Sequence, residues 1–263
     1  MLGIIIGIAA IITIVSTIKG TNEQIKKNLI GAGNNVVTVQ LNQSGYAYDM
    51  SWQGAPSGVR VITEETREEL ETIDGVEKVS LYTGRSYAQM VFYKNTGYEG
   101  QMYGIDDNFL SVTGYQVKSG RGFTENDYKN FRKVVLVDTI AVTTLFGGED
   151  PVGKSVEIQE DVYTVVGVVA LSEDFTPTIN NLNEYYMYAN TSAGAIYMPS
   201  AVWPTAYQFD EPQNVAIKVE STDVMTTAGK AAADLLTEKQ IVDPDNSDFD
   251  YRSQDMLEQA QQL

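Results

Sequence analysis

The feature that most constrains this chain is an uncharged apolar run near its N-terminus. Residues 2–18 read LGIIIGIAAIITIVSTI, seventeen residues without a charge, which is the lower limit for a helix that crosses a bilayer. A cleaved signal peptide carries a basic segment before its apolar run and a small-residue cleavage site after it, and neither is recognisable here. A core helix of a globular domain is rarely apolar on every face. We therefore expect a membrane-spanning helix.

A second helix is expected directly after this run. Thr21 and Gln24 have the spacing of a capping box, in which each side chain bonds to the backbone at the helix start. Gly31 and Gly33 are placed to end the helix. Gly20 lies between the two predicted helices, and with Thr21 it is the expected hinge where the chain leaves the membrane.

The composition excludes several classes of function. The chain contains no His and no Cys, which removes the Ser-His-Asp and Cys-His triads, the usual zinc sites and any disulfide framework. Lys and Arg number 18 against 35 Asp and Glu, a net charge of −17, and such a charge repels the phosphates of nucleic acids. We therefore expect that the protein is not an enzyme and has no catalytic residues, cofactor or metal ion. We also expect that it does not bind nucleic acid.

One sequence motif, by contrast, suggests a nucleotide-binding site. GEDPVGKS, residues 148–155, fits the phosphate-binding P-loop pattern. A P-loop follows a strand and opens a helix, because the helix N-terminus holds the phosphates. Here the pattern predicts a helix before the motif and a β-hairpin after it. Glu149 and Asp150 would repel a nucleotide, and Pro151 lacks a backbone N–H. The motif is better interpreted as a turn from a helix to a strand.

Hydrophobic patterning along the rest of the chain predicts a mixture of strands and helices. Short β-branched runs predict strands, and Ser, Thr or Asp before an amphipathic run predicts a helix start. The predicted strands cover residues 35–41, 76–84, 86–95, 99–105, 132–138, a hairpin within 154–170, 214–220 and 248–253, and a short strand over 195–203 that Pro199 breaks. The predicted helices cover residues 63–75, 139–146 and 222–240, a short helix from near Asp106, and the C-terminal residues from 253. This order is typical of an α+β fold.

Two finer expectations concern single elements. Residues 118–128 are polar and contain two Gly, so we expect a turn there. The helix over 222–240 is amphipathic, and spacing predicts that its buried face is made of Val224, Ala228, Ala231 and Leu235.

Two Tyr-rich loops are the candidate binding surface. Residues 42–58 and 171–194 are rich in Gly, Ser, Asn and aromatic residues without a period, which is typical of loops. Their aromatic side chains either form a contact surface for a substrate or partner, or fold back onto the domain. The residues concerned are Tyr46, Tyr48, Trp52, Tyr185, Tyr186 and Tyr188.

The order of several segments resembles one known family. The start LGIIIGIAAIITIVSTIKGTNEQI is similar to the end of the first transmembrane helix of MacB/FtsX-type ABC permeases. Four further segments, in this order, resemble the extracytoplasmic part of these permeases. They are GIDDNFLSVTGYQVKSGRGFTENDYKNFRKVVLVD, LFGGEDPVGKSVEIQEDVYTVVGVV, IYMPSAVW and SQDMLEQAQ. Together these segments extend over nearly the whole chain.

The resemblance implies a domain organisation. Residues 1–34 would be the end of the transmembrane helix and a stalk helix. A porter-like α/β-sandwich subdomain would be discontinuous, with an inserted β-rich, sabre-like subdomain between its two parts. The porter-like parts would be residues 35–105 and 212–252, the insert 106–211, and residues 253–263 the start of a stalk helix toward the second transmembrane helix.

The resemblance also implies a function. The chain would be the extracellular domain of an ABC transporter permease. The permease would lie in the cell membrane, and the domain would face the outside of a Gram-positive-type cell. It would couple ATP hydrolysis by a separate cytoplasmic ATPase to export of a peptide-like or amphipathic substrate, as in antimicrobial peptide or drug efflux. A second permease copy and an adaptor protein would be its other partners. Two alternatives remain open: an FtsX- or lipoprotein-release-like regulatory coupling domain, and a membrane-anchored solute-binding or adhesion module.

Overall fold

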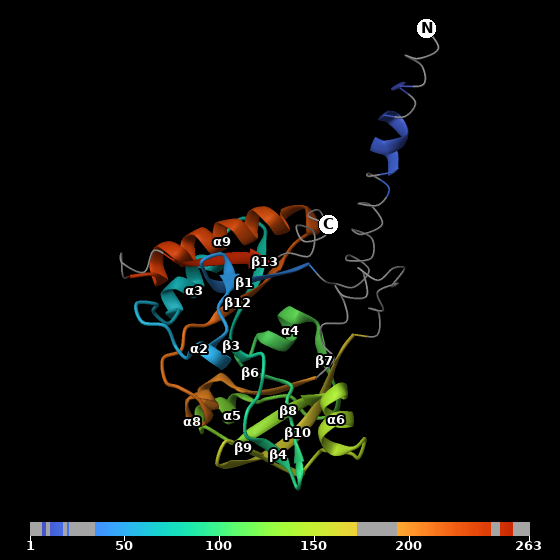
Figure 1. The fold of residues 1–263 in the computed structure, drawn as a ribbon, viewed down its shortest axis with the longest axis vertical. Coiled ribbons are helices and arrows are strands. Elements are labelled where there is room, and N and C mark those ends of the chain that lie inside the picture. The colour runs from blue at the N-terminus through green and yellow to red at the C-terminus, as the bar shows by residue number, and fades with distance from the viewer. Residues whose placement is uncertain are drawn as a thin grey trace.

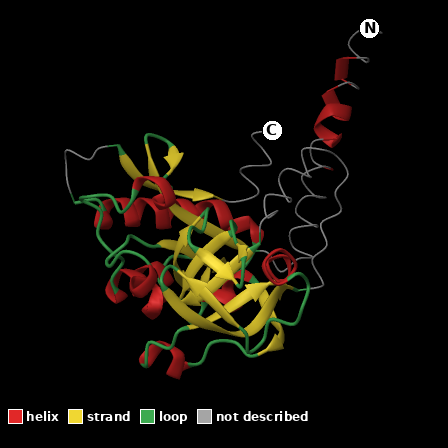
Figure 2. Cartoon of the chain, turned by 60° about the horizontal axis from the view of Figure 1, so that its bottom comes forward, coloured by secondary structure: helices red, strands yellow, loops and turns green. Residues whose placement is uncertain are grey.

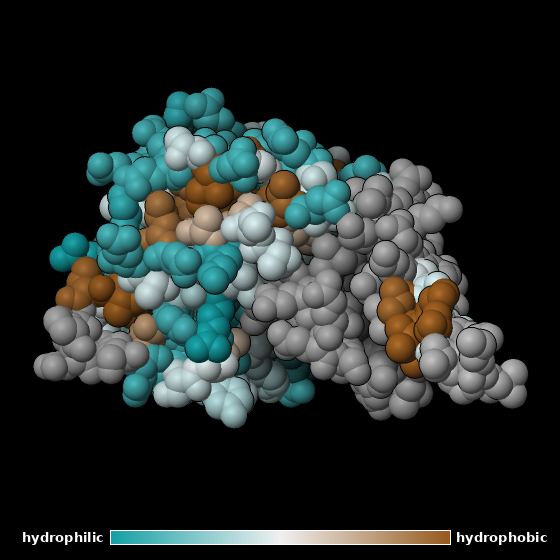
Figure 3. Space-filling model, turned by 90° about the horizontal axis from the view of Figure 1, so that it is seen from above, coloured by the Kyte–Doolittle hydropathy of each residue, from teal (hydrophilic) through white to brown (hydrophobic). Residues whose placement is uncertain are grey.

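The structure is a computed structural model that describes residues 7–8, 11–17, 20, 35–172, 194–242 and 248–254. Residues 11–17 and Gly20 are helical. Within the described ranges, no helix combines the length and apolar character needed to cross a membrane. Most of the two predicted N-terminal helices, and the predicted C-terminal helix, lie outside these ranges. The described apolar residues near the N-terminus stand apart from the mainly hydrophilic surface of the body (Figure 3).

The described strands join into one 13-stranded mixed sheet. Its order begins with β13 (Phe249–Gln254), β1 (Val36–Gln43), β12 (Asn214–Val219), β3 (Val76–Arg85), β6 (Gln101–Ile105) and β11 (Ala195–Pro199). It continues with β8 (Val134–Asp138), β10 (Asp161–Leu171), β9 (Ser155–Ile158), β4 (Val91–Tyr93) and β5 (Thr96–Gly97). Off this path, β2 (Tyr46–Ala47) pairs with β1 and β7 (Tyr115–Gly120) with β10. Only the pairs β6–β11 and β8–β10 are parallel among the pairings described.

Short helices pack on this sheet, and one long helix covers its end (Figures 1 and 2). They are α2 (Met50–Gln53), α3 (Glu64–Glu71), α4 (Phe109–Thr113), α5 (Glu125–Lys129), α6 (Thr139–Phe146), α8 (Trp203–Ala206) and α9 (Met225–Gln240). Two 3-10 turns, η1 (Ser200–Val202) and η2 (Thr222–Val224), precede α8 and α9. The α+β expectation is confirmed as a mixed fold with a large sheet.

Predicted caps lie where local chemistry requires them. The Thr63 side chain accepts a hydrogen bond from the Thr66 N–H at the start of α3. Asp138 accepts one from the Ala141 N–H at 2.6 Å and starts α6. That helix ends at Gly147 in the left-handed conformation. Both helix starts and the end of α6 therefore follow from single residues.

The core divides into clusters along the sheet. In the first cluster, α3 and α9 pack on β13, β1, β12 and β3, through residues such as Val37, Leu70, Ile217 and Leu236. In the second, α6 and α8 pack on β8, β9, β10 and β11, through residues such as Val135, Leu145, Val165 and Trp203. A smaller aromatic cluster with Tyr82, Phe109 and Tyr197 lies between them. The α3/α9 end and the β4/β9 end are opposite ends of the body in Figure 1.

Three local expectations are wrong. The predicted turn at 118–128 contains the end of β7 and most of α5. Thr124 and Asp127 form the capping box of α5 with Asp in place of the usual Glu or Gln, so the signal was overlooked. β7 is mostly exposed and pairs only with β10 among the described strands, so its sequence lacks alternation. The strand predicted at 86–95 is reduced to β4, with a turn and β5 after it.

The third error is the face of α9. Its buried residues are Met225, Ala228, Gly229, Ala232, Ala233, Leu236 and Gln240. Ala231 is exposed and Leu235 is only partly buried. A Cβ on Gly229 would lie 2.7 Å from Cγ1 of Val37, so the helix approaches β1 closely at that glycine. The buried stripe is therefore centred one residue further along than the apolar spacing predicts.

Candidate functional site

An exposed apolar cavity lies beside α2 and β4. It has a volume of about 430 Å³ and is lined by Trp52, Tyr87, Ala88, Gln89, Met90, Val91, Phe92, Gly97, Tyr98 and Glu99. Three of its large side chains are strongly exposed: Trp52 by 69%, Met90 by 50% and Phe92 by 42%. Apolar side chains gathered at one cavity indicate a binding surface more than scattered ones do. We call these ten residues the aromatic cavity.

The short helix α2 places Trp52 at this cavity. Asp49 caps the helix by accepting from the Ser51 N–H at 2.8 Å, and the Ser86 hydroxyl donates to the same carboxylate. Burial alone would raise the pKa of Asp49, but the hydrogen bonds from Ser86 and Ser51 outweigh it and the pKa is lowered. Met50 is only 7% exposed and anchors the helix in the body. Trp52 is therefore held on a fixed base.

Trp52 also has a direct aromatic partner. Its ring stacks on that of Tyr87, with centroids 5.7 Å apart and planes inclined by 26°. A hydrogen bond to Glu99, then burial, raises the pKa of Tyr87. Glu99 is the one charged residue among the ten that line the cavity. The surface thus combines flat apolar rings with a carboxylate.

The structure separates the residues predicted as a binding surface. Trp52 lines the aromatic cavity, and Tyr46 is 81% exposed on β2. Tyr48 folds back: its ring meets Phe249 edge-on at 5.3 Å, and its hydroxyl donates to the Gly54 carbonyl at 3.1 Å. The other three predicted residues, Tyr185, Tyr186 and Tyr188, lie outside the described residues.

The predicted hinge is described only in part. Gly20 is helical, with open space around the position of an added Cβ. Thr21 lies outside the described residues. The hinge therefore remains a prediction.

Sequence reasoning missed most of the aromatic cavity. Tyr87, Met90, Phe92 and Glu99 were assigned to ordinary strands. One signal was available: residues 90–93 read MVFY, four consecutive apolar residues, where a strand with one exposed face alternates. The juxtaposition with Trp52 had no such signal, because residues 52 and 87 are distant along the chain.

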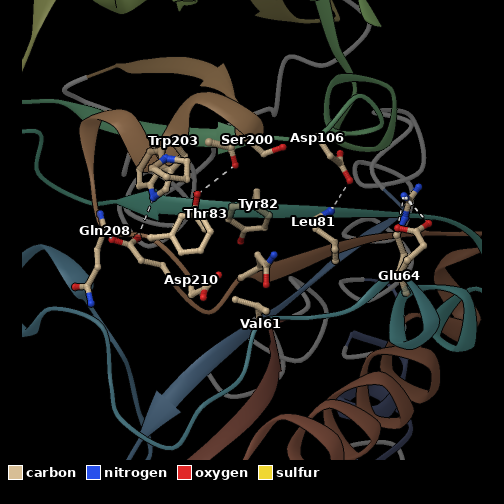
Figure 4. A pocket seen from close by; sticks show the side chains of 16 residues that line it. Val61, Glu64, Leu81, Tyr82, Thr83, Asp106, Ser200, Trp203, Gln208 and Asp210 are labelled. Carbon is tan, nitrogen blue, oxygen red and sulfur yellow. Dashed lines mark hydrogen bonds and ion pairs between the residues drawn. The ribbon is translucent and has the colours of Figure 1, made fainter. Parts of the chain in front are cut away.

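A second cavity of about 330 Å³ is lined by residues of all three core clusters, among them Leu81, Tyr82 and Trp203 (Figure 4). In this view Leu81, Tyr82 and Thr83 of β3 lie between Trp203 and Ser200 above and Val61 and Asp210 below. We call this the junction cavity. Asp106 lies at its edge, where its carboxylate accepts from the Ser80 hydroxyl at 2.6 Å and the Leu81 N–H at 2.7 Å. Burial is the main cause of a raised pKa of Asp106, against which these hydrogen bonds act.

Glu211, which lines the junction cavity, forms a buried ion pair with Arg85. The side chains of Arg85 and Glu211 are 9% and 1% exposed. Arg85 donates to Glu211 with both terminal nitrogens, one of them at 2.9 Å from Oε2. Trp203 Nε1 donates to the same oxygen at 2.9 Å, and the Gln208 N–H donates to Oε1 at 3.1 Å. Both carboxylate oxygens are therefore bonded, which a buried charge requires.

The P-loop-like motif has a structural use of its own. Its lysine, Lys154, pairs with Glu149 of the same motif at 2.5 Å. The ammonium group also lies over the rings of Tyr93 and Phe146, 5.5 and 6.0 Å from their centroids. Strand β9 begins at Ser155, where a P-loop has a helix. The interpretation as a turn from a helix to a strand is confirmed.

We expect Lys154→Ala to change nothing in the response of the chain to Mg·ATP. A nucleotide present at one hundred times its Kd would stabilise the folded chain by about 2.7 kcal/mol. Thermal unfolding with and without Mg·ATP measures this, with Lys94→Ala as a control because Lys94 also lies over Tyr93, at 4.8 Å. The interpretation of the motif as a turn would be contradicted if Mg·ATP stabilised the wild type and the Lys94→Ala variant but not the Lys154→Ala variant.

Metal ligands are not clustered in the described ranges. Within them, no group of three or more His, Cys, Asp or Glu side chains is arranged to hold a metal ion.

Comparisons with known proteins agree on one family. The model of the MacB-like periplasmic core domain family matches residues 1–235. The chain is 32% identical to the uncharacterized ABC transporter permease YvrN of Bacillus subtilis, over 100% of the chain and 62% of that protein. It is 29% identical to the macrolide export ATP-binding/permease protein MacB of Aggregatibacter actinomycetemcomitans, over 72% of the chain and 28% of that protein. The chain thus spans less than two thirds of these relatives.

Two solved structures share the fold. One is the periplasmic region of MacB from Actinobacillus actinomycetemcomitans, with a TM-score of 0.60 at 21% identity, covering 91% of this chain and 96% of that one. The other is the extracellular domain of the transporter YknZ from Gram-positive bacteria, with a TM-score of 0.55 at 20% identity, covering 84% of this chain and 100% of that one.

Proposed function

The chain belongs to the MacB-like periplasmic core domain family, and on this premise we propose that it couples ATP hydrolysis to export in an ABC transporter. In this proposal it is the extracytoplasmic domain of a permease subunit, and a separate cytoplasmic chain hydrolyses the ATP. The domain itself performs no catalysis. The match to the family over residues 1–235 is the observation that carries the proposal.

The likeness to permeases extends over the whole chain. YvrN, which is named as an ABC transporter permease, matches all of it. The fold is that of the extracellular region of YknZ and of the periplasmic region of MacB. One of these regions is extracellular and the other periplasmic, so we place this domain on the same side of the cytoplasmic membrane. A Gram-positive-type envelope remains a prediction.

We propose a two-part architecture within the domain. The first core cluster takes its residues only from 35–105 and 212–252, which supports a discontinuous porter-like subdomain. The second cluster is mostly built from 106–211, which supports an inserted sabre-like subdomain. Ala88, Val91 and Tyr98 also belong to the second cluster, since β4 pairs with β9. In this proposal residues 86–100 therefore pack with the insert, although they precede it in the chain.

Transmission of motion would use the two ends of the chain. Residues 2–30 and 253–263 would form stalk helices between this domain and the membrane part, and rigid helices transmit displacement between two discrete states. A second permease copy and the cytoplasmic ATPase would complete the assembly, with an adaptor protein as a further partner. The substrate would be peptide-like or amphipathic, and the aromatic cavity is the surface that supports this.

Co-purification tests the proposal. The full-length permease that contains this chain is expressed with candidate ABC ATPase subunits from the same genome, and the complex is placed in lipid nanodiscs. We expect both proteins to purify together and the complex to hydrolyse ATP. Absence of any ATPase partner would contradict the proposal.

The same preparation separates the two alternatives. A regulatory, FtsX-like role predicts a bound cell-wall hydrolase and no transport. An anchored binding module predicts one membrane helix in the complete gene, whereas the permease proposal predicts several.

A further inference from the structure

The geometry points to the aromatic cavity as a site where an extended, cationic, amphipathic peptide docks along the free edge of β5. This inference rests on the proposed function and names the substrate class of its binding surface. It combines three observations: an apolar cavity with exposed rings, a carboxylate at its rim, and unpaired backbone at a sheet edge.

The apolar part is already formed before any ligand binds. Trp52 is 69% exposed, yet the buried Met50 and the Asp49–Ser86 hydrogen bond hold its helix in place. Rigid, exposed aromatic rings bind apolar groups at a low cost in conformational entropy. The cavity of about 430 Å³ is large enough for one or two apolar side chains of a ligand.

The charge of the site selects a cation. Glu99 is the one charged side chain lining the cavity. The whole chain carries a net charge of −17, which attracts cations and repels anions over longer distances. Trp52 and Tyr87 add π faces that also attract cations. An anionic ligand finds no complementary group among the lining residues.

The sheet edge distinguishes a peptide from other amphipathic cations. β5 ends the described sheet order, and β4 is its one partner there. The Tyr98 N–H donates to the Val91 carbonyl at 2.9 Å, so the backbone groups of the preceding residue, Gly97, point away from β4. Gly97 lines the cavity and has no side chain to shield this edge. An extended peptide can therefore add a strand here, with its apolar side chains over the rings.

Tryptophan fluorescence tests the site directly. The chain has two Trp residues, and Trp203 is only 3% exposed. The probe is a short peptide of alternating Leu and Lys, which has no aromatic residue. We expect it to shift the emission of Trp52 to shorter wavelengths in a saturable way. A matched Leu/Glu peptide and a Ser/Lys peptide should give no saturable shift.

Variants locate the binding, measured by the anisotropy of a dye-labelled Leu/Lys peptide. We expect Trp52→Ala to weaken binding at least about tenfold, and Glu99→Gln to weaken it by about threefold to fivefold. Phe209→Ala is the matched control, because Phe209 is 70% exposed but lies at the junction cavity. Its affinity should equal that of the wild type.

Three results would overturn the inference: equal binding of the Leu/Glu peptide, unchanged affinity of Trp52→Ala, or a loss in Phe209→Ala as large as in Trp52→Ala. Circular dichroism confirms that each variant is folded. Failure of the site leaves the proposed function untouched, because the co-purification with an ATPase does not involve Trp52. Failure of that co-purification likewise leaves peptide binding to the chain measurable.

Discussion

Replacement of Glu211 by Ala should lower the free energy of unfolding by about 3–5 kcal/mol, because it leaves a buried arginine without its partner. Arg85 is 9% exposed at its side chain, and Glu211 bonds both to it and to Trp203. The guanidinium also lies over the rings of Trp203 and Tyr207, at 5.3 and 4.7 Å. Urea unfolding, followed by the fluorescence of Trp203, measures the loss.

Two further variants show whether charge is the cause. Arg85→Met combined with Glu211→Leu removes both charges and should recover most of the stability, since well-packed apolar residues often replace a buried ion pair without loss. Lys129→Ala breaks the exposed pair with Glu125 and should leave the urea midpoint unchanged. A single Glu211→Ala variant as stable as the wild type would show that the pair is open to solvent.

Gly120→Ala should destabilise the chain by about 3 kcal/mol, through strain and overlap together. Gly120 has φ +72, and a Cβ there would lie 2.3 Å from the carbonyl oxygen of Val166 and 2.8 Å from Cα of Gly167. Both contacts are to backbone atoms, which cannot turn aside as a side chain can. The pairing of β7 with β10 would therefore have to shift, and the urea midpoint reports it.

Gly114 provides the control for backbone strain alone. It has φ +78, close to that of Gly120, but nothing lies within 4 Å of an added Cβ. Gly114→Ala should cost only about 1 kcal/mol, the strain of the left-handed conformation. Equal losses in the two variants would mean that the close approach of β7 and β10 contributes nothing.

The sequence predicts those parts of the fold that depend on neighbouring residues. Asp138 and Gly147 specify both ends of α6 by their own chemistry, and the Val-rich run of residues 134–137 predicts a buried strand. The turn at the P-loop-like motif follows from alternation around Val156 and Ile158. These features need no knowledge of the rest of the chain.

Features that depend on distant segments could not be predicted. β12 lies between β1 and β3, although it follows them by more than a hundred residues. No local pattern specifies this order. The same holds for the candidate site: Trp52 was identifiable as an aromatic residue in a loop, but its stacking on Tyr87 depends on how α2 packs at the end of β3. The buried face of α9 differs from the predicted one because Gly229 packs closely against β1, a strand from the other end of the chain.

The most direct test of the proposed coupling is a Gly-Gly insertion after Gly20 in the full-length permease. If rigid helices transmit motion from the ATPase to this domain, flexible residues at the predicted hinge stop export while ATP hydrolysis continues. The measurement is ATP hydrolysis and ATP-dependent transport of the Leu/Lys peptide by the reconstituted complex. The same insertion after Gly148, in the exposed turn between α6 and β9, is the control and should leave export intact. Export that remains coupled after the insertion at Gly20 would contradict the account.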